Sequence, residues 1–503
     1  EVEEAKQPKR KNTKKQEQTV PVLPEREAKG SYDVIPEGMK VLSEGMANVL
    51  YDASKQTQVF YNPAMETNRD ISIAMVHVFI QILEQEANSK QSKIAKKYRN
   101  LPQDAMGDEN RKGIRILEAL SATGLRSIRY ARELPPQAVH SIVANDLDEA
   151  AVAAIDRNVQ FNFLSTKLAK ASDDQIAAAP VIPNHANANQ CMHEATDSRF
   201  HVVDIDPYGT PSIFLDAAVQ SVTEGGLLCI TATDMPVLCG KYNETCFAKY
   251  GATSLNGGNC HEMALRVLLG CIERHATQYK RTVVPLVSLS VDYYVRIFVR
   301  VYTSPAEVKK SASKMGYLLH CSSCTSHEVV PMMQTIETKT KKGGTSVKYK
   351  LGHIPMASAC KQCQSGRIQV AGPCWIDPLF DDDVLKQLMD HLSQNQGSYN
   401  SYSRLFGLLT AMANELRDVP FLYSVSRLCK VLHVDCPSLG SVKAAIINGG
   451  YQVSGSHTDP IAIKTNAPNE FIWDIFRAWE KEHPIKKPKQ PTAATRILAV
   501  EPK

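Results

Sequence analysis

The feature that most constrains this chain is a series of short apolar runs that each end in an acidic residue, with helical patterns between them. Strands that alternate with helices form a parallel sheet with helices on both faces. Ligands of such sheets bind beyond the carboxyl ends of the strands. The sequence therefore predicts a site where these acids gather. The runs are IRILEAL (114–120), HSIVAND (140–146), FHVVDID (200–206) and GGLLCITATD (225–234).

A chain of 503 residues is long enough for further domains besides the one that contains these runs. We expect residues 1–30, which are polar and Lys-rich, to be a disordered arm. This arm could be a nuclear address, a nucleic-acid-binding arm or a solubilising tail. We expect the α/β domain to span 31–305 and a smaller, mixed domain to span 306–503. Its last part, from about residue 375, has mostly helical patterns and ends in a predicted strand at TRILAV (495–500).

Two elements of the α/β domain can be predicted individually. The segment 71–86 is long, apolar and free of Gly and Pro, which predicts a helix. The segment 287–302 alternates between apolar and more polar residues, which predicts one long, half-buried strand.

Composition excludes few functions. No apolar run reaches about 18 residues, so we expect no membrane span. Thirteen cysteines in so long a chain do not form a disulfide scaffold and indicate a reducing compartment. The net charge of +5 weakly favours a polyanionic partner. Because the chain begins at Glu1, a targeting segment could be missing.

The turn after the first run indicates a cofactor. In LEALSATGLRS (117–127), Glu118 closes the strand and Gly124 permits close backbone approach. A single glycine is not the G-x-G-x-x-G pattern of dinucleotide sites and suits the amino-acid part of S-adenosylmethionine better. Asp146, at the next strand end, could accept from both ribose hydroxyls, and Asn187 could read an adenine edge. Each residue taken alone could also be a turn or helix-cap residue.

The motif DIDPYG (204–209) fits methylation of an exocyclic amine. Such a nitrogen is a poor nucleophile until acceptors take its protons and turn its lone pair toward the methyl donor. Asp206 offers a carboxylate, the carbonyl of Pro207 is a second acceptor, and Tyr208 offers a stacking face. The alternative is a plain strand-end turn that caps the following helix.

With these motifs the chain resembles a known family, the tRNA guanine-N2 dimethyltransferases, which modify the guanine between the D stem and the anticodon stem. The resemblance covers about residues 50 to 500. The matching stretches are VFYNPAMETNRD (59–70), EALSATGLRSIR (118–129), ANDLDEAAV (144–152), DIDPYGTPSIFLDAA (204–218), GGLLCITATDM (225–235), ETCFAKYGA (244–252), CHEMALR (260–266) and SASK (311–314).

The resemblance implies a Rossmann-like class I S-adenosylmethionine-dependent methyltransferase domain. It implies that Arg69, Arg126 and Asp146 contact S-adenosylmethionine and that Asp206 is the catalytic carboxylate. It also implies that Phe60 and Tyr208 sandwich the flipped guanine. The family often has Asp-Ala after the third strand, where this chain has Asn187 and Ala188. We expect these two residues to take that place, because Asn also accepts from an adenine amino group.

A cysteine quartet predicts a metal. Two C-x-x-C pairs, Cys321 with Cys324 and Cys360 with Cys363, would give a closed four-thiolate site for structural zinc within a module at 321–363. Redox pairs or metal-free thiols are the alternatives. We expect His320, His327 and His353 to be surface residues rather than ligands and Trp375 to be core. The lysines of the intervening hairpin and two arginines of the 287–302 segment could contact tRNA phosphates: Lys339, Lys341, Lys342, Lys348, Lys350, Arg296 and Arg300.

Together these features predict an enzyme that adds one or two methyl groups to N2 of a tRNA guanine. We expect tRNA as its partner, no membrane association and a monomer without an obligate protein partner. We expect it in the nucleus, with the mitochondrion as a second location. The rival hypotheses are another amine methyltransferase that acts on DNA or a protein amide, an inactive RNA-binding homologue, and a zinc-containing adaptor.

Overall fold

The computed structural model describes residues 35–52, 61–88, 113–164, 180–339, 345–353, 358–484 and 492–502. The predicted arm at 1–30, Phe60, Lys341 and Lys342 lie outside these residues. Within the described part, no helix is long and apolar enough to cross a membrane.

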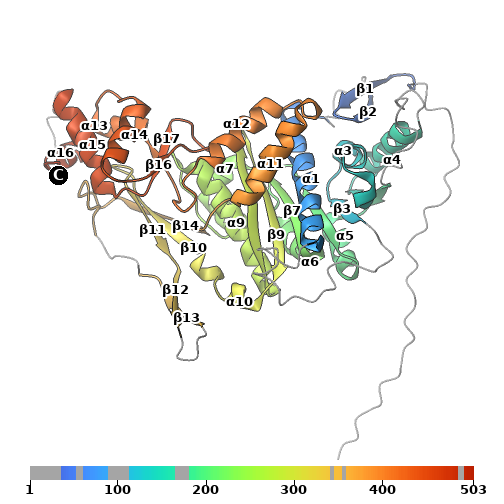
Figure 1. Ribbon diagram of the computed structural model, residues 1–503, viewed down its shortest axis with the longest axis horizontal. Helices are drawn as coiled ribbons and strands as arrows, with labels where there is room; N and C mark the ends of the chain where they lie inside the picture. The colour runs from blue at the N-terminus through green and yellow to red at the C-terminus, as the bar shows by residue number, and fades with distance from the viewer. Residues whose placement is uncertain are drawn as a thin grey trace, which may run out of the picture.

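A seven-stranded sheet forms the centre of the molecule (Figure 1), in the order β5-β4-β3-β6-β7-β9-β8. The first five of these strands are parallel, whereas β9 and β8 close one edge as an antiparallel pair. The strand order reverses between β3 and β6, which is where ligands of such sheets bind. The strands are β3 (Ile114–Glu118), β4 (Val139–Asp146), β5 (Val181–His185), β6 (Phe200–Ile205), β7 (Val222–Ala232), β8 (Arg281–Val291) and β9 (Tyr294–Thr303).

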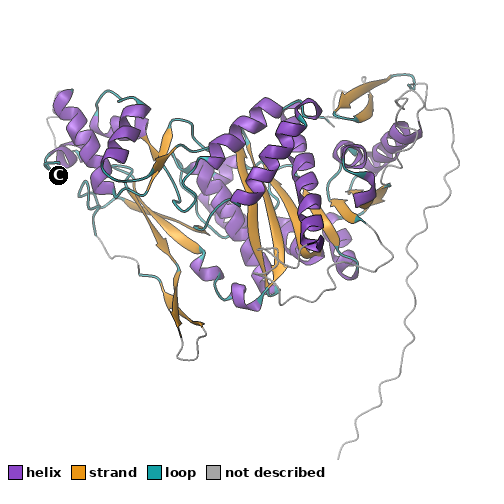
Figure 2. Ribbon diagram, viewed as in Figure 1, coloured by secondary structure: helices purple, strands orange, loops and turns teal. Residues whose placement is uncertain are grey.

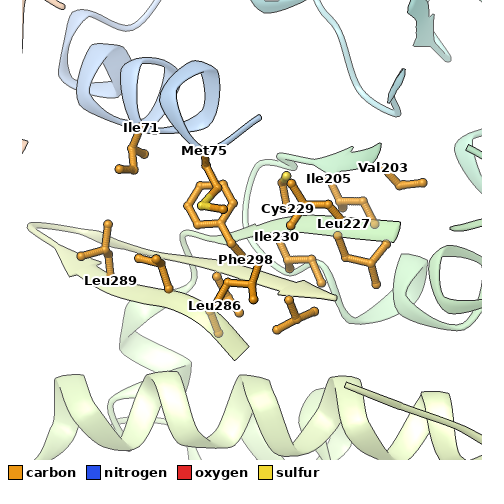
Figure 3. Close-up of a cluster of buried hydrophobic side chains, with 14 of the residues drawn as sticks. Ile71, Met75, Val203, Ile205, Leu227, Cys229, Ile230, Leu286, Leu289 and Phe298 are labelled. Atoms are coloured by element: carbon orange, nitrogen blue, oxygen red, sulfur yellow. The ribbon is translucent and has the colours of Figure 1, made fainter. Parts of the chain in front are cut away.

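Helices connect the parallel strands and cover the sheet (Figure 2), as the alternating pattern predicts. The predicted helix at 71–86 lies within α1 (Glu66–Asn88), from which Ile71 and Met75 point toward Phe298 and Cys229 of the sheet (Figure 3). These side chains belong to one cluster of buried apolar residues. The other helices are α3 (Leu125–Glu133), α4 (Glu149–Leu164), α5 (Ala188–Glu194), α6 (Leu215–Ser221), α7 (Met235–Leu238), α8 (Asn243–Tyr250) and α9 (Cys260–Gln278).

The predicted single strand at 287–302 is wrong. The chain instead turns back at Asp292 and Tyr293, so that β8 and β9 form a hairpin. Asp292 adopts φ +45°, a left-handed conformation that ends the first strand. The hairpin is buried on both faces rather than half-buried, because its polar positions are satisfied inside the protein, as described below for Arg296 and Arg300.

The described residues after 305 form three small sheets and a set of helices. β10 (Met315–Cys321) pairs with β11 (His327–Pro331) and β14 (Ile368–Trp375), and the predicted hairpin between the cysteine pairs is β12 (Met333–Lys339) with β13 (Thr345–Leu351). This hairpin projects from the body (Figure 1). Helix α10 (Pro305–Val308) precedes these strands in the chain, and α11 (Asp382–Gln394) and α12 (Tyr402–Ala413) follow them and pack beside α1. Trp375 is buried, as predicted.

A second cluster of buried residues lies at the carboxyl-terminal end of the molecule (Figure 1) and includes the four cysteines. The predicted strand at TRILAV is wrong, because a capping box between Thr492 and Thr495 begins helix α16 there. The first buried cluster runs from residue 47 to residue 421 and so crosses position 305; the boundary at 305 stays a prediction. The elements here are β15 (Tyr423–Ser424), α13 (Val425–Leu432), α14 (Leu439–Asn448), β16 (Val453–Ser454), β17 (Ala462–Thr465), α15 (Asn469–Glu482) and α16 (Ala493–Leu498).

Candidate active site

The predicted acids meet at the carboxyl edge of the parallel strands, because the strand register brings their ends together. Glu118 of β3 lies opposite Ala144 of β4 and Asp204 of β6. The turn after β3 is joined to both neighbouring strands, since Ala119 N donates to Asp204 O (2.9 Å) and Ser121 N donates to Asn145 O (2.8 Å).

The turn between β3 and α3 has the tight geometry that its glycine predicts. Gly124 caps α3 with φ +76°, and a Cβ atom there would lie 3.2 Å from Ile155. Ala122 has φ +47° and donates its N–H to Asp146 Oδ2 (2.8 Å). Asp146 is thereby held against the glycine turn.

Glu118 is a buried carboxylate behind this turn. It accepts hydrogen bonds from the N–H (3.0 Å) and the hydroxyl (2.5 Å) of Ser127 at the start of α3. Burial raises the pKa of Glu118 to about 7, although the Arg126 guanidinium and the Ser127 hydroxyl lower it.

Arg126 links the acids of the site. Its Nη1 donates to Asp204 (2.9 Å), and its Nη2 makes a short ion pair with Asp206 and donates to Asn68 of α1 (3.2 Å). Its Nε lies 3.6 Å from Glu118 and is buried without a hydrogen-bond partner among the described residues. Arg126 and Asp206, which the sequence analysis assigned to cofactor and catalysis separately, are thus in direct contact.

Asp204 is the functional residue that the sequence reasoning missed. It is fully buried and accepts from Arg126, from both Nη atoms of Arg296 (2.9 and 2.8 Å) and from the hydroxyl of Tyr130 (2.8 Å). The signal was the pair of acids two positions apart in DID, because residues i and i+2 of a strand share one face. Asp204 and Asp206 therefore contact the same arginine.

The hypothesis that Arg296 and Arg300 contact phosphates is wrong. Arg296 is 0% exposed and is bound to Asp204, Thr231 and Ser72. Arg300 is 2% exposed and forms a two-fold ion pair with Glu86 of α1. Both guanidiniums are structural cations that connect the β8–β9 hairpin to the rest of the fold.

Tyr208 stands at the tip of the motif and is 87% exposed, whereas Pro207 is buried and Asp206 is half-buried. The turn is fixed to the end of β7, because Gly209 and Thr233 exchange two hydrogen bonds of 2.7 and 2.9 Å. Gly209 has φ +88°, a conformation that favours glycine.

Two other predicted cofactor residues, Arg69 and Asn187, lie in local interactions. Arg69 forms a two-fold ion pair with Glu44 of β1 (Met39–Glu44), at 2.6 and 2.5 Å, and also donates to Asn62 O (3.2 Å). β1 pairs with β2 (Ala47–Asp52) in a separate hairpin. Asn187 is exposed and caps α5 by accepting from Asn189 N (2.9 Å), followed by the buried Ala188.

The four cysteines form a compact, buried cluster. Cys321 and Cys363 are 3.6 Å apart at sulfur, as are Cys324 and Cys360. All four sulfurs lie within 4.8 Å of one another. Corresponding backbone bonds shape both loops, since Cys321 N donates to Ser326 O (2.9 Å) and Cys360 N donates to Ser365 O (2.8 Å).

Comparison with known proteins identifies similar chains. Residues 38–477 match the family described as N2,N2-dimethylguanosine tRNA methyltransferase. The chain is 38% identical to the tRNA (guanine(26)-N(2))-dimethyltransferase of Mus musculus over 92% of this chain and 71% of that one. It is 36% identical to the mitochondrial tRNA (guanine(26)-N(2))-dimethyltransferase of Saccharomyces cerevisiae over 93% and 84%.

A solved structure also matches. The complex of Trm1 from Pyrococcus horikoshii with S-adenosyl-L-methionine is 27% identical, with a TM-score of 0.67 over 87% of this chain and 99% of that one. The likeness therefore extends over both the sheet and the region that follows it.

Proposed function

The chain belongs to the family of N2,N2-dimethylguanosine tRNA methyltransferases, and from this premise we propose how its residues carry out the reaction. The protein is an S-adenosylmethionine-dependent enzyme that methylates N2 of a tRNA guanine, guanine 26 at the junction of the D stem and the anticodon stem. The observation that carries the proposed mechanism is the contact between Arg126 and Asp206 at the sheet's carboxyl edge.

The residues around the glycine turn fit the cofactor. S-adenosylmethionine supplies the methyl group when it is bound. We propose that Gly124 gives its amino-acid part room, that Glu118 and Arg126 meet the charges of that part, and that Asp146 accepts from the ribose hydroxyls. The buried, unpartnered Nε–H of Arg126 supports this assignment, because a carboxylate is an acceptor of the required charge.

The adenine end and Arg69 complete the proposed pocket. Asn187 and Ala188 follow β5, whose carboxyl end adjoins Asp146 on β4. Their position supports a contact with the adenine ring by the Asn187 amide. Arg69 would join the cofactor only by sharing or leaving its ion pair with Glu44.

Asp206 and Pro207 activate the amine. The lone pair of N2 is delocalised into the guanine ring, so the amine becomes nucleophilic only when acceptors hold its protons out of the ring plane. We assign one acceptor to the Asp206 carboxylate and the other to the Pro207 carbonyl. Methylation would replace one N–H bond of N2 by a bond to the methyl group, whose bond to the cofactor's sulfur would break and leave its electron pair on the sulfur; the proton displaced from N2 would pass to the Asp206 carboxylate. The amine would therefore compete with Arg126 for Asp206.

Tyr208 receives the base. Its ring is almost fully exposed while the turn beneath it is fixed, which makes it a rigid stacking face for an extruded guanine. Phe60 is proposed for the opposite face from the family resemblance, and it lies outside the described residues.

The experiment that tests the mechanism is a comparison of Asp206→Ala with Asp216→Ala. Asp216 is a partly exposed acid that accepts from the Tyr279 hydroxyl. We expect Asp206→Ala to abolish methyl transfer to tRNA while its affinity for S-adenosylmethionine stays near that of the wild type. Asp216→Ala should keep its activity. Wild-type activity in Asp206→Ala would refute the catalytic assignment.

The cysteine cluster fits a structural zinc ion. A tetrahedral site with Zn–S bonds of about 2.3 Å separates its sulfurs by about 3.8 Å, close to the 3.6 Å of both described pairs. We propose Cys321, Cys324, Cys360 and Cys363 as its ligands. The cluster also supports α15 and α16, because Trp473 donates to Ser326 (2.8 Å) and Arg496 donates to Cys363 O (3.2 Å).

tRNA is the partner, and we propose that the β12–β13 hairpin contributes phosphate contacts through Lys339, Lys348 and Lys350, which are exposed. We further propose that the enzyme acts as a monomer in the nucleus, with the mitochondrion as a second location. The name of the Saccharomyces cerevisiae relative is consistent with the second location. Sedimentation velocity tests the first proposal, and localisation of the tagged chain tests the second.

A further inference from the structure

Apolar side chains are exposed around the strand tip that carries Tyr208. Ile213 follows in the next turn of the same loop and is 65% exposed. Tyr242 precedes α8 and Phe247 lies within it, 42% and 62% exposed. Because α8 packs against the turn that carries Ile213, we treat these residues as one surface, which we call the aromatic rim (Tyr208, Ile213, Tyr242 and Phe247).

The rim is fixed to the catalytic loop. Tyr250, at the end of α8, donates to Asp234 (2.6 Å) and accepts from Thr210 of the loop (2.8 Å). Lys249 forms an ion pair with the same Asp234 (3.0 Å). Because Thr210 lies two residues after Tyr208, these hydrogen bonds join α8 directly to the loop that carries Tyr208.

The charges beside the rim favour an anion. The Nζ atom of the exposed Lys241 lies 5.4 Å from the centroid of the Tyr242 ring, whereas Lys249, two residues after Phe247, is half-buried and already paired with Asp234. The only acid within α8 is Glu244. Exposed aromatic rings next to lysines can bind the unpaired nucleotides of a single strand, because every base has a stacking face and every phosphate attracts a cation.

We propose that the aromatic rim binds unpaired or extruded RNA nucleotides next to the target guanine, with Phe247 and Tyr242 as stacking faces. This inference rests on the proposed function and deepens it. Extruding a base from a junction leaves its neighbours without a stacking partner. Rings that cover those neighbours would offset part of the cost of unstacking, and they would favour substrates whose target lies at a junction.

The test measures tRNA binding by the full-length, zinc-loaded chain in the variants Phe247→Ala and Phe247→Trp. Tyr279→Ala is the matched control, since Tyr279 is 39% exposed and lies two residues before β8, whose start lies at the sheet edge opposite the strand tips. Unmodified tRNA transcript is titrated at several salt concentrations, and S-adenosylmethionine affinity and thermal unfolding are recorded for each variant.

We expect Phe247→Ala to weaken tRNA binding about five- to hundredfold, because stacking on one ring contributes a free energy of that order. Phe247→Trp should retain affinity, and Tyr279→Ala should resemble the wild type. The slope of log affinity against log salt should not change in Phe247→Ala, since no phosphate contact is lost. S-adenosylmethionine affinity should be unchanged.

Three results would overturn the inference: wild-type tRNA affinity in Phe247→Ala, an equal loss in Phe247→Trp, or loss of self-association in place of tRNA affinity. The last result would assign the rim to a second copy of the chain. If the wild-type chain binds tRNA but transfers no methyl group, the proposed function fails while the rim can still be tested by binding.

Discussion

Replacing the buried acid of the motif, Asp204→Asn, should damage both stability and catalysis. The Asp204 carboxylate neutralises two buried arginines, Arg126 and Arg296, that are themselves at most 4% exposed. The asparagine amide has the same shape as the carboxylate but no charge, so both guanidiniums lose the negative charge of Asp204. Arg126 also contacts Asp206, the proposed catalytic carboxylate, so we expect the loss of charge at Asp204 to displace Asp206 as well.

The magnitude follows from the pKa of Asp204. Burial would raise this pKa, but Arg126 and Arg296 lower it from 3.8 to about 2. Such a difference corresponds to about 2–3 kcal/mol of stability at neutral pH. This contribution is complete above about pH 4 and is lost as the pH falls through about 2. Because the variant also leaves the buried Arg296 without its acidic partner and removes one of the acids paired with Arg126, we expect a total loss of about 3–5 kcal/mol.

Thermal unfolding at neutral pH measures this loss. A destabilisation of about 3–5 kcal/mol should lower the Tm of the sheet domain by on the order of 10 °C. Single-turnover methyl transfer, measured well below the new Tm, should fall about a hundredfold, because a displaced Asp206 no longer meets the amine correctly. Asp216→Asn, on the surface, is the control. An Asp204→Asn variant with wild-type Tm and rate would refute the positioning role.

Three further predictions follow from other parts of the molecule. Burial raises the pKa of Glu118 from 4.5 in the unfolded chain to about 7 in the folded protein. The wild type should therefore lose about 3 kcal/mol of stability as the pH rises from about 4.5 through 7. Unfolding measured at several pH values should show a flatter dependence for Glu118→Gln. Metal analysis of reduced protein should find about one zinc per chain, and Cys363→Ser should lose it together with the stability of the carboxyl-terminal helices; well under one zinc in the wild type would exclude the site. Lys348→Ala should reduce the salt slope of tRNA binding by about one, whereas Arg300→Ala should lower stability and leave the slope unchanged; equal slopes in both variants would contradict the assignment of Lys348.

Much of the sheet could be predicted because strand and helix periods alternate clearly between 114 and 234. The β8–β9 hairpin could not, because its residues alternate without a break and the turn at Asp292 has no glycine. The carboxyl-terminal TRILAV is rich in strand-forming residues, yet the capping box at Thr492 and Thr495 begins a helix there. The helix cap outweighed the strand propensity of the residues in that segment.

The candidate site could be predicted only as far as local motifs define it. The glycine turn, Asp146 and the DIDPYG tip each carry a signal within a few residues. The pairing of Asp204 with Arg126 and Arg296 joins residues 78 and 92 positions apart, and no local pattern reports such a contact. The sequence therefore predicts an exposed cation at Arg296, whereas the structure buries this residue.

The most direct test of the central claim is methyl transfer from labelled S-adenosylmethionine to unmodified tRNA, followed by separation of the product nucleosides. A transcript in which guanine 26 is replaced by adenine serves as the matched substrate control. We predict label in N2-methyl- or N2,N2-dimethylguanosine from the natural sequence and none from the replaced one. Label in another nucleoside, equal label in both transcripts, or transfer only to DNA or protein would contradict the account.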